Sequence, residues 1–209
     1  LQELPTLQEQ TPFFTFLFYD STHSPYGFDK ETAPFVPFIP YVYYSQLDDK
    51  SKLPQLINRY KNAVHFVDGL VGNILEEVRR RGLMDNTIIL ITGDHGEEFM
   101  EKGRWGHNSA FTDEQIRTPM VLWVPGMKPS VYERMSNHMD VIPTLMPMFG
   151  VKNPKRDYTT GINLLSDEVR SHAVLAEWSS TAYIDDEVKI AMPLAVVATQ
   201  HPRVTGPHD

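Results

Sequence analysis

The segment Asn86–Glu98 reads NTIILITGDHGEE, an apolar run followed at once by an acidic residue and a histidine between two glycines. Its first part, Asn86–Thr92, is typical of a strand that is buried on both faces of a sheet. The glycines permit a tight turn, so the side chains of Asp94 and His95 could reach one point. A carboxylate and an imidazole are ordinary zinc ligands, which predicts a metal site. The alternative is that Asp94 caps a short helix with the two following glutamates in its first turn.

Helix and strand patterns alternate along the rest of the chain. Apolar residues recur at steps of three and four from Leu53 to Val78, which predicts a long amphipathic helix that stops near Gly82. The other predicted elements are buried strands over Phe13–Tyr19 and Met120–Val124, a helix over Met139–Phe149, late strands over Ala173–Trp178 and Val188–Ala198 with a turn at Asp185-Asp186, and an irregular loop over residues 27–50. This order predicts an α/β fold, in which ligands bind beyond the carboxyl ends of the strands.

The composition excludes several kinds of function. The chain has 209 residues, a formal net charge of -8 and no cysteine. The negative charge argues against a general nucleic-acid binder, and the chain offers no disulfide, thiolate metal site or cysteine nucleophile. No apolar run is as long as a membrane span. Because the chain begins at Leu1 rather than at a methionine, we expect it to be an excised or processed piece of a longer protein.

Histidines flank the predicted metal turn. His107, in RWGHN, and His23, in THSPY, lie in polar loops, where a histidine usually bonds only to water or backbone. Gathered near one metal, they could instead hold and polarise the oxygens of a phosphate or sulfate. His138 is a further site candidate, with a contact at a helix N-terminus as its alternative role. His65 lies beside the apolar face of the long helix and is assigned a structural role.

Four segments in a fixed order resemble the sulfatase-like branch of the alkaline phosphatase superfamily. They are Arg59–Asp68, Ile91–Glu98 followed by Gly106-His107, Thr118–Gly126, and His138–Leu145. Within that branch, the chain is most similar to the membrane-anchored phosphoethanolamine transferases and lipoteichoic acid synthases. The resemblance implies a mixed, mostly parallel sheet sandwiched between helices. Residues 1–209 would form the C-terminal portion of a single catalytic domain of this kind.

The resemblance also implies roles for individual residues. In that family an early glutamate, a threonine nucleophile and an Asp-His pair hold one divalent metal, so Asp94 and His95 are expected to be metal ligands. His107 and His23 are expected to contact substrate oxygens. Zinc suits such a pair, and manganese, magnesium and calcium are alternatives. No serine or threonine lies in the family's nucleophile context, and the Cys/Ser-x-Pro-x-Arg motif of true sulfatases is missing. We therefore expect the nucleophile upstream of Leu1, and no activity from this chain alone.

The activity implied by the resemblance is that of a metal-dependent hydrolase or transferase. It would act on phosphate or sulfate esters, lipids and envelope glycans among them, through a covalent enzyme intermediate. The parent protein would be anchored in a membrane and face the periplasm or the cell exterior. A catalytically inactive regulatory or lipid-sensing domain is the alternative, against which the intact set of Asp94, His95 and His107 argues. A phosphomutase-type relative with two metals would need more ligands than can be placed.

Overall fold

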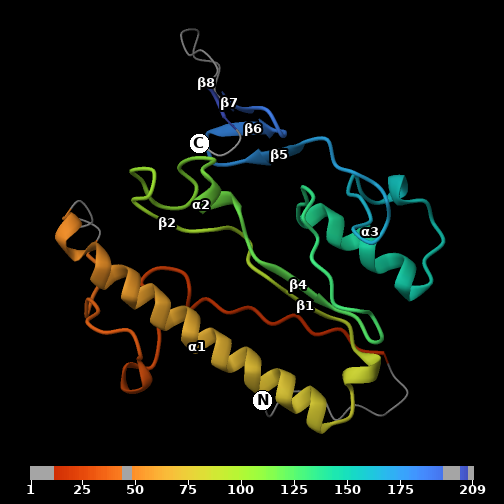
Figure 1. Cartoon of the computed structure of the whole chain (residues 1–209), viewed down its shortest axis with the longest axis horizontal. Coiled ribbons are helices and arrows are strands. Elements are labelled where there is room, and N and C mark those ends of the chain that lie inside the picture. The colour runs from red at the N-terminus through yellow and green to blue at the C-terminus, as the bar shows by residue number, and fades with distance from the viewer. Residues whose placement is uncertain (1–11, 44–48, 195–202, 207–209) are drawn as a thin grey trace. The chain divides into compact units, whose positions relative to one another are not determined.

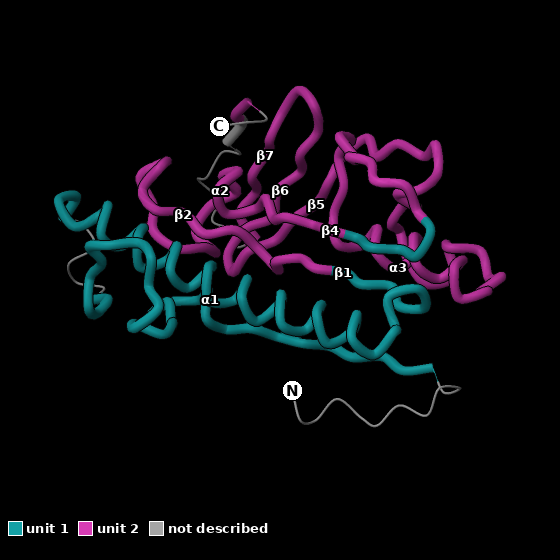
Figure 2. Tube along the Cα trace, turned by 60° about the horizontal axis from the view of Figure 1, so that its bottom comes forward, with its two compact units in different colours: residues 1–90, 122–126 teal, residues 91–121, 127–209 magenta. Residues whose placement is uncertain are grey.

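A computed structural model of the chain describes residues 12–43, 49–194 and 203–206 (Figure 1). The chain divides into two compact units, which are coloured separately in Figure 2. Unit 1 comprises Leu1–Leu90 and Leu122–Gly126, and unit 2 comprises Ile91–Val121 and Met127–Asp209.

Unit 1 is built on one long helix. Helix α1 spans Leu53–Arg80 and confirms the helix predicted from the apolar spacing. It follows the short 3-10 helix η3 (Lys50–Lys52) and carries a proline in its first turn, where the missing N–H costs nothing. The chain leaves the helix through Gly82, whose φ of 68° favours glycine, and enters η4 (Met84–Asn86).

Two buried polar residues of α1 hold the irregular loop that precedes it. The Arg59 guanidinium donates to the carbonyl oxygens of Pro25 at 2.7 Å, Ile39 at 3.1 Å and Pro40 at 3.0 Å. Asn62 accepts from the backbone N–H of Phe35 and donates to its carbonyl, both at 2.9 Å. The loop contains only the short helix η1 (Lys30–Thr32) among the residues that the structure describes. The irregular loop predicted over residues 27–50 is therefore confirmed for residues 27–43, where side chains rather than a sheet fix its backbone, and residues 44–48 lie outside the described residues.

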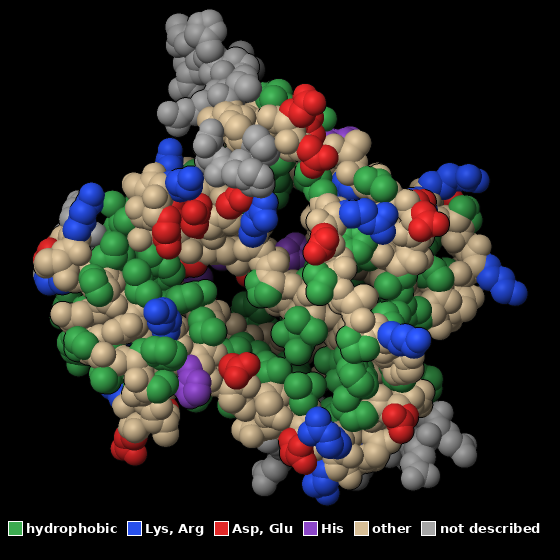
Figure 3. Space-filling model, in the orientation of Figure 1, with side chains coloured by type: hydrophobic (Ala, Val, Ile, Leu, Met, Phe, Trp, Pro, Cys, Tyr) green, Lys and Arg blue, Asp and Glu red, His purple; other side chains and the backbone are tan. Residues whose placement is uncertain are grey.

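The strand predicted over Phe13–Tyr19 is wrong. The segment pairs with no other strand in the described residues, and most of its apolar side chains are exposed, with Phe14 at 90%. Hydrophobic side chains accordingly cover much of the face drawn in Figure 3. A strand needs a neighbour to bond its backbone, and no described segment supplies one for these residues. An apolar run shows a tendency to be buried, but it cannot provide the partner.

Two of the other predicted strands are confirmed. Strands β1 (Ile89–Thr92) and β4 (Met120–Trp123) form a two-stranded sheet, and each has residues in both units. Strand β1 begins three residues later than predicted, because Asn86 closes the short helix η4.

The centre of unit 2 combines a small hairpin with a larger sheet. Strands β2 (Glu98–Phe99) and β3 (Trp105–Gly106) pair antiparallel, and α2 (Asp113–Ile116) follows them. The antiparallel sheet has the order β5-β6-β7-β8, with the strands Ala173–Ala176, Ser180–Ile184, Lys189–Pro193 and Arg203–Thr205. These four strand pairs, β2–β3, β5–β6, β6–β7 and β7–β8, are all antiparallel. None of them corresponds to the parallel part of the predicted sheet.

The late strands are largely as predicted, with one addition. Strands β5 and β7 confirm the strands expected after residues 172 and 187, although residues 195–198 of the second prediction lie outside the described residues. Strand β6 was not predicted, because its Ser180 and Thr181 obscure the apolar alternation. The Asp185 turn is confirmed, since its backbone N–H donates to Val188 O at 3.0 Å. Phe111 packs with Ala182 and Ile184 of β6 in a small core.

The helix predicted over residues 139–149 is confirmed as a broken helical segment. It consists of η5 (His138–Asp140), α3 (Val141–Leu145) and η6 (Met146–Phe149), and it ends at Gly150 with a φ of 78°. Proline at 143 and 147 removes backbone donors, which explains why the segment does not form one continuous α-helix. A further short helix, η7, spans Lys155–Asp157.

Candidate metal centre

The predicted metal turn is a tight loop between β1 and β2, so the alternative of a helix capped by Asp94 is wrong. The Gly96 N–H donates to Gln115 O at 2.8 Å. A side chain at this glycine would place its Cβ 2.1 Å from Glu114 O, so only glycine fits against that backbone. Within the turn, Asp94 accepts a hydrogen bond from the His95 backbone N–H at 3.0 Å. The turn is therefore held by its backbone and presents both side chains outward.

The His95 ring is oriented as a metal ligand would be. Its Nδ1 lies 2.9 Å from Gly96 O, and since a carbonyl oxygen only accepts, Nδ1 carries the hydrogen. This leaves the lone pair on Nε2, which lies 3.6 Å from Asp94 Oδ2. In the neutral ring, two acceptor atoms thus face each other, an arrangement that a cation between them would stabilise. Two ligands of one tetrahedral zinc at about 2.0–2.1 Å would be separated by roughly 3.4 Å, close to the observed distance.

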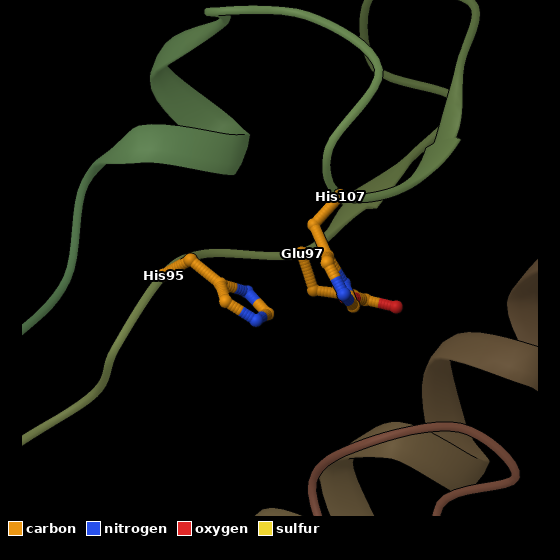
Figure 4. A group of neighbouring side chains, drawn as sticks. All are labelled: His95, Glu97 and His107. Carbon is orange, nitrogen blue, oxygen red and sulfur yellow. The ribbon is translucent and has the colours of Figure 1, made fainter. Parts of the chain in front are cut away.

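A second histidine approaches the same point, together with a carboxylate. His107 follows β3, and its Nδ1 lies 2.7 Å from Glu97 Oε2, so this nitrogen donates to the carboxylate. The ring centroids of His95 and His107 are 3.8 Å apart. One ligand atom from each of His95, Glu97 and His107 lies within 4.8 Å of the others. Figure 4 shows the three side chains converging from the metal turn and from the end of β3.

The structure brings together only some of the predicted site residues. Asp94, His95 and His107 belong to unit 2, where Asp94 touches His95 and the two imidazoles lie against each other at an interplanar angle of 30°. His23 belongs to unit 1, and its Nδ1 lies 2.9 Å from Ser24 O. Its role toward a substrate remains a prediction.

Glu97 was missed as a site residue because it was considered only for the first turn of a helix. Its side chain is 9% exposed and lies against His107, ten residues along the chain. The spacing His-x-Glu could have suggested it, since these side chains lie on one side of an extended segment.

His138 takes part in the site without reaching the cluster. Its Nε2 lies 2.8 Å from Gly93 O and therefore donates to this carbonyl. The same nitrogen is 3.4 Å from the Thr92 hydroxyl. The ring thus ties helix η5 to the residue before Asp94 and supports the metal turn.

The donor set fits a divalent metal. Asp94, Glu97 and the two histidines offer only carboxylate oxygens and imidazole nitrogens, which zinc accepts. Each imidazole donates its Nδ1 hydrogen to a carbonyl or a carboxylate, as the imidazoles of metal-bound histidines do. The chemistry of the donors does not distinguish zinc from manganese.

The family follows from comparison with known proteins. The sequence profile of the sulfatase family matches residues 1–151, and the chain belongs to this family. It is 28% identical over 123 residues to a choline-sulfatase of Rhizobium meliloti, covering 57% of the chain and 24% of that protein. It is 28% identical over 138 residues to the inner membrane protein YejM of Salmonella typhimurium, covering 65% and 23%. Lipoteichoic acid synthase 1 of Bacillus subtilis is 24% identical over 165 residues, covering 74% and 24%. The chain thus spans about a quarter of the length of these relatives.

Solved structures show the same fold. The protein BT4656 in complex with its substrate D-glucosamine-2-N,6-O-disulfate matches with a TM-score of 0.61 and 19% identity, covering 75% of the chain and 35% of its own. A protein of the alkaline phosphatase superfamily from Vibrio parahaemolyticus matches with a TM-score of 0.54 and 16% identity, covering 88% and 38%. The predicted superfamily and the alkaline phosphatase-like α/β fold are therefore confirmed, with the chain forming part of that fold.

None of the helices in the described residues is both long enough and apolar enough to cross a bilayer.

Proposed function

We propose that this chain contributes the metal-binding half of the active site of a metal-dependent sulfatase that hydrolyses sulfate esters. The observation that carries the proposal is the distance of 3.6 Å between His95 Nε2 and Asp94 Oδ2. The ring hydrogen of His95 is on the other nitrogen, Nδ1, where Gly96 O accepts it. Family membership supports the reaction class. The name of the choline-sulfatase and the disulfated sugar that is the substrate of BT4656 support a sulfate ester as substrate.

Asp94 and His95 would hold the metal, and Glu97 would orient His107 beside it. A divalent cation, zinc in this proposal, supplies a Lewis acid that draws charge from ester oxygens. The fixed tautomer of His95 keeps its ligand atom directed at Asp94 before any cation binds. Little reorganisation is then needed when the cation arrives.

His107 is proposed to contact the oxygens of the sulfate group. Glu97 accepts the Nδ1 hydrogen at 2.7 Å and so fixes the orientation of the ring. The proposed contact with a sulfate oxygen is made by Nε2. His23 is proposed to contact the same group. The reaction is proposed to pass through a covalent enzyme intermediate, with a nucleophile outside the residues assigned here.

Transfer of a phosphate group is the second candidate function. The similarity to lipoteichoic acid synthase 1, over 74% of the chain, favours it. The same donor set serves both reactions, because sulfate and phosphate esters present similar tetrahedral oxygens. We further propose a membrane-associated protein that acts at the periplasmic or extracellular face on an envelope lipid or glycan. The name of the inner membrane protein YejM supports the association with a membrane.

The test uses the natural full-length protein with Asp94→Ala and His95→Ala. Both variants should lose the stoichiometric metal seen by elemental analysis, together with hydrolysis of an aryl sulfate. An aryl phosphate assayed in parallel distinguishes the two candidate reactions. His65→Ala is the matched control, because this histidine is exposed on α1 and contacts only an aromatic ring in the described residues. Unchanged metal content in both site variants would refute the assignment.

A further inference from the structure

A fully buried carboxylate lies directly behind the metal turn. Glu98 begins β2, three residues after His95, and its side chain is 0% exposed. No lysine, arginine or histidine in the part of the chain that the structure describes forms an ion pair with it. Burying an unpaired charge is costly, and an apolar side chain would pack here without that cost. The carboxylate therefore serves a purpose other than packing.

Its charge is balanced by four hydrogen bonds from two directions. Oε1 accepts from the backbone N–H of Lys102 at 3.0 Å and of Arg104 at 2.9 Å, which fixes the turn of the β2–β3 hairpin. Oε2 accepts from the Thr112 hydroxyl at 2.8 Å and from the Gln115 side-chain amide at 2.9 Å. Burial by itself would raise the pKa of Glu98, but these bonds, led by that from Gln115, together bring the pKa below its ordinary value. The group is therefore a stable buried anion.

Gln115 extends this network to both histidines. Its side-chain oxygen accepts from the backbone N–H of Ser109 and Ala110, both at 3.2 Å, just after His107. Its own carbonyl accepts from the Gly96 N–H at 2.8 Å, just after His95. One buried glutamine thus bonds to the chain next to each of the two neighbouring imidazoles, and Glu98 fixes the orientation of its amide.

We propose that Glu98 and Gln115 are positioning residues that hold the rings of His95 and His107 at their 3.8 Å separation before metal binds. The proposal rests on the role assigned above to these two histidines. Neither positioning residue contacts the metal or the substrate. They act by fixing the two backbone segments from which the rings project, since ligand orientation depends on the groups that support the ligands.

The charge pattern of the pair provides a sharp test. In Glu98→Gln, the new side-chain NH2 group replaces one of the two carboxylate oxygens. In one orientation it faces the backbone N–H groups of Lys102 and Arg104, and in the other it faces the side-chain NH2 group of Gln115. In both orientations, hydrogen-bond donors face each other. In Gln115→Glu, two buried carboxylates face each other. In the double variant E98Q/Q115E, the amide at position 98 accepts from the backbone and donates to the carboxylate at position 115. That carboxylate still accepts from the backbone N–H groups of Ser109 and Ala110. Two hydroxyl groups must turn: that of Thr112 now accepts from the amide at position 98, and that of Ser109, which accepts from Gln115 at 3.0 Å in the unsubstituted protein, now donates to the carboxylate. The swap thus restores the other pairings.

The experiment measures the histidine rings and zinc affinity in the natural full-length protein. In the metal-free protein, nitrogen NMR should show the Nδ1–H form of His95. Glu98→Gln should broaden or shift the ring signals and lower zinc affinity, measured by chelator competition, by about ten- to a hundredfold. The swap should restore both to nearly the original values. Leu56→Ala, a buried site on α1, controls for loss of stability alone and should leave the ring signals unchanged.

The opposite results would overturn the proposal. A folded Glu98→Gln variant with unchanged ring signals and zinc affinity would do so, as would a folded swap no better than either single variant. If Glu98→Gln fails to fold, Thr112→Val removes one of the four bonds, and unchanged ring signals there would be equally decisive. Absence of zinc binding and hydrolysis in the unsubstituted protein would refute the proposed function, whereas the ring signals of the metal-free protein still test the positioning.

Discussion

Replacing Asp140 by asparagine should destabilise the protein strongly. The Asp140 side chain is 0% exposed and accepts from the backbone N–H groups of Asn137 and Ile162, both at 2.8 Å. It also forms an ion pair with Arg170, whose side chain is only 12% exposed. In Asp140→Asn the arginine loses its counter-charge, and the new amide turns N–H groups toward donors. Removing one partner of a buried pair costs about 3–5 kcal/mol, and we expect a loss of this size.

The measurement is chemical denaturation, followed by tryptophan fluorescence and circular dichroism, on the unsubstituted protein and the variant. Lys155→Met is the matched control, because the Lys155–Glu168 pair lies in the same unit but is exposed, and its loss should cost no more than about 1 kcal/mol. A decrease of less than about 1 kcal/mol in the free energy of unfolding of Asp140→Asn would refute the reasoning, because the Asp140–Arg170 pair would then contribute no more than an exposed ion pair does.

The Asp140→Asn substitution should also weaken the support of the metal turn. Asp140 and Asn137 form the capping box of helix η5, in which His138 is the next residue. His138 donates to Gly93 O, beside Asp94. If the hydrogen bonds of the capping box are lost, His138 no longer holds the backbone beside Asp94. The variant should therefore bind zinc more weakly even at temperatures where it remains folded.

Four further predictions concern other parts of the chain. Lys189→Met removes the buried ammonium that donates to Phe111 O at 2.6 Å, and thermal melts should show a loss of about 1–3 kcal/mol. Glu97→Gln keeps an acceptor for His107 but removes the charge, so initial rates should fall by roughly tenfold while elemental analysis shows the metal retained. Hydrogen bonds from Arg80 and Arg81 lower the pKa of Glu77 from 4.5 to about 2, so its stabilisation is full above pH 4.5 and is lost as the pH falls toward 2. Acid titrations of stability should therefore be shallower over that range in Glu77→Gln, and equal slopes would contradict this. The 209-residue chain alone should hydrolyse neither an aryl sulfate nor an aryl phosphate with added zinc, and turnover that Asp94→Ala abolishes would contradict the placing of the nucleophile elsewhere.

Features that depend on neighbouring residues could be predicted from the sequence. Helix α1 follows from apolar spacing and a glycine stop, and strands β1 and β4 follow from short apolar runs. The Asp94-His95 turn could be predicted from its polar residues between two glycines, whereas the need for glycine at position 96 comes from the close approach of Glu114 O. The superfamily and its α/β fold could be predicted for the same reason, since the motifs are contiguous segments.

Only the tertiary structure decided which side chains meet across the chain. The contact of Glu97 with His107 joins residues ten apart through the β2–β3 hairpin, and no local pattern specifies that pairing. The burial of Glu98 likewise depends on donors from Lys102 to Gln115. Conversely, Phe13–Tyr19 has the composition of a buried strand and remains exposed, because burial requires a partner surface that composition cannot supply. The sequence determined the chemical groups of the site and the turn that carries two of them. The three-dimensional fold determined the distances between these groups and which of their nitrogen atoms carry a hydrogen, because both depend on contacts between segments that are separate in the sequence.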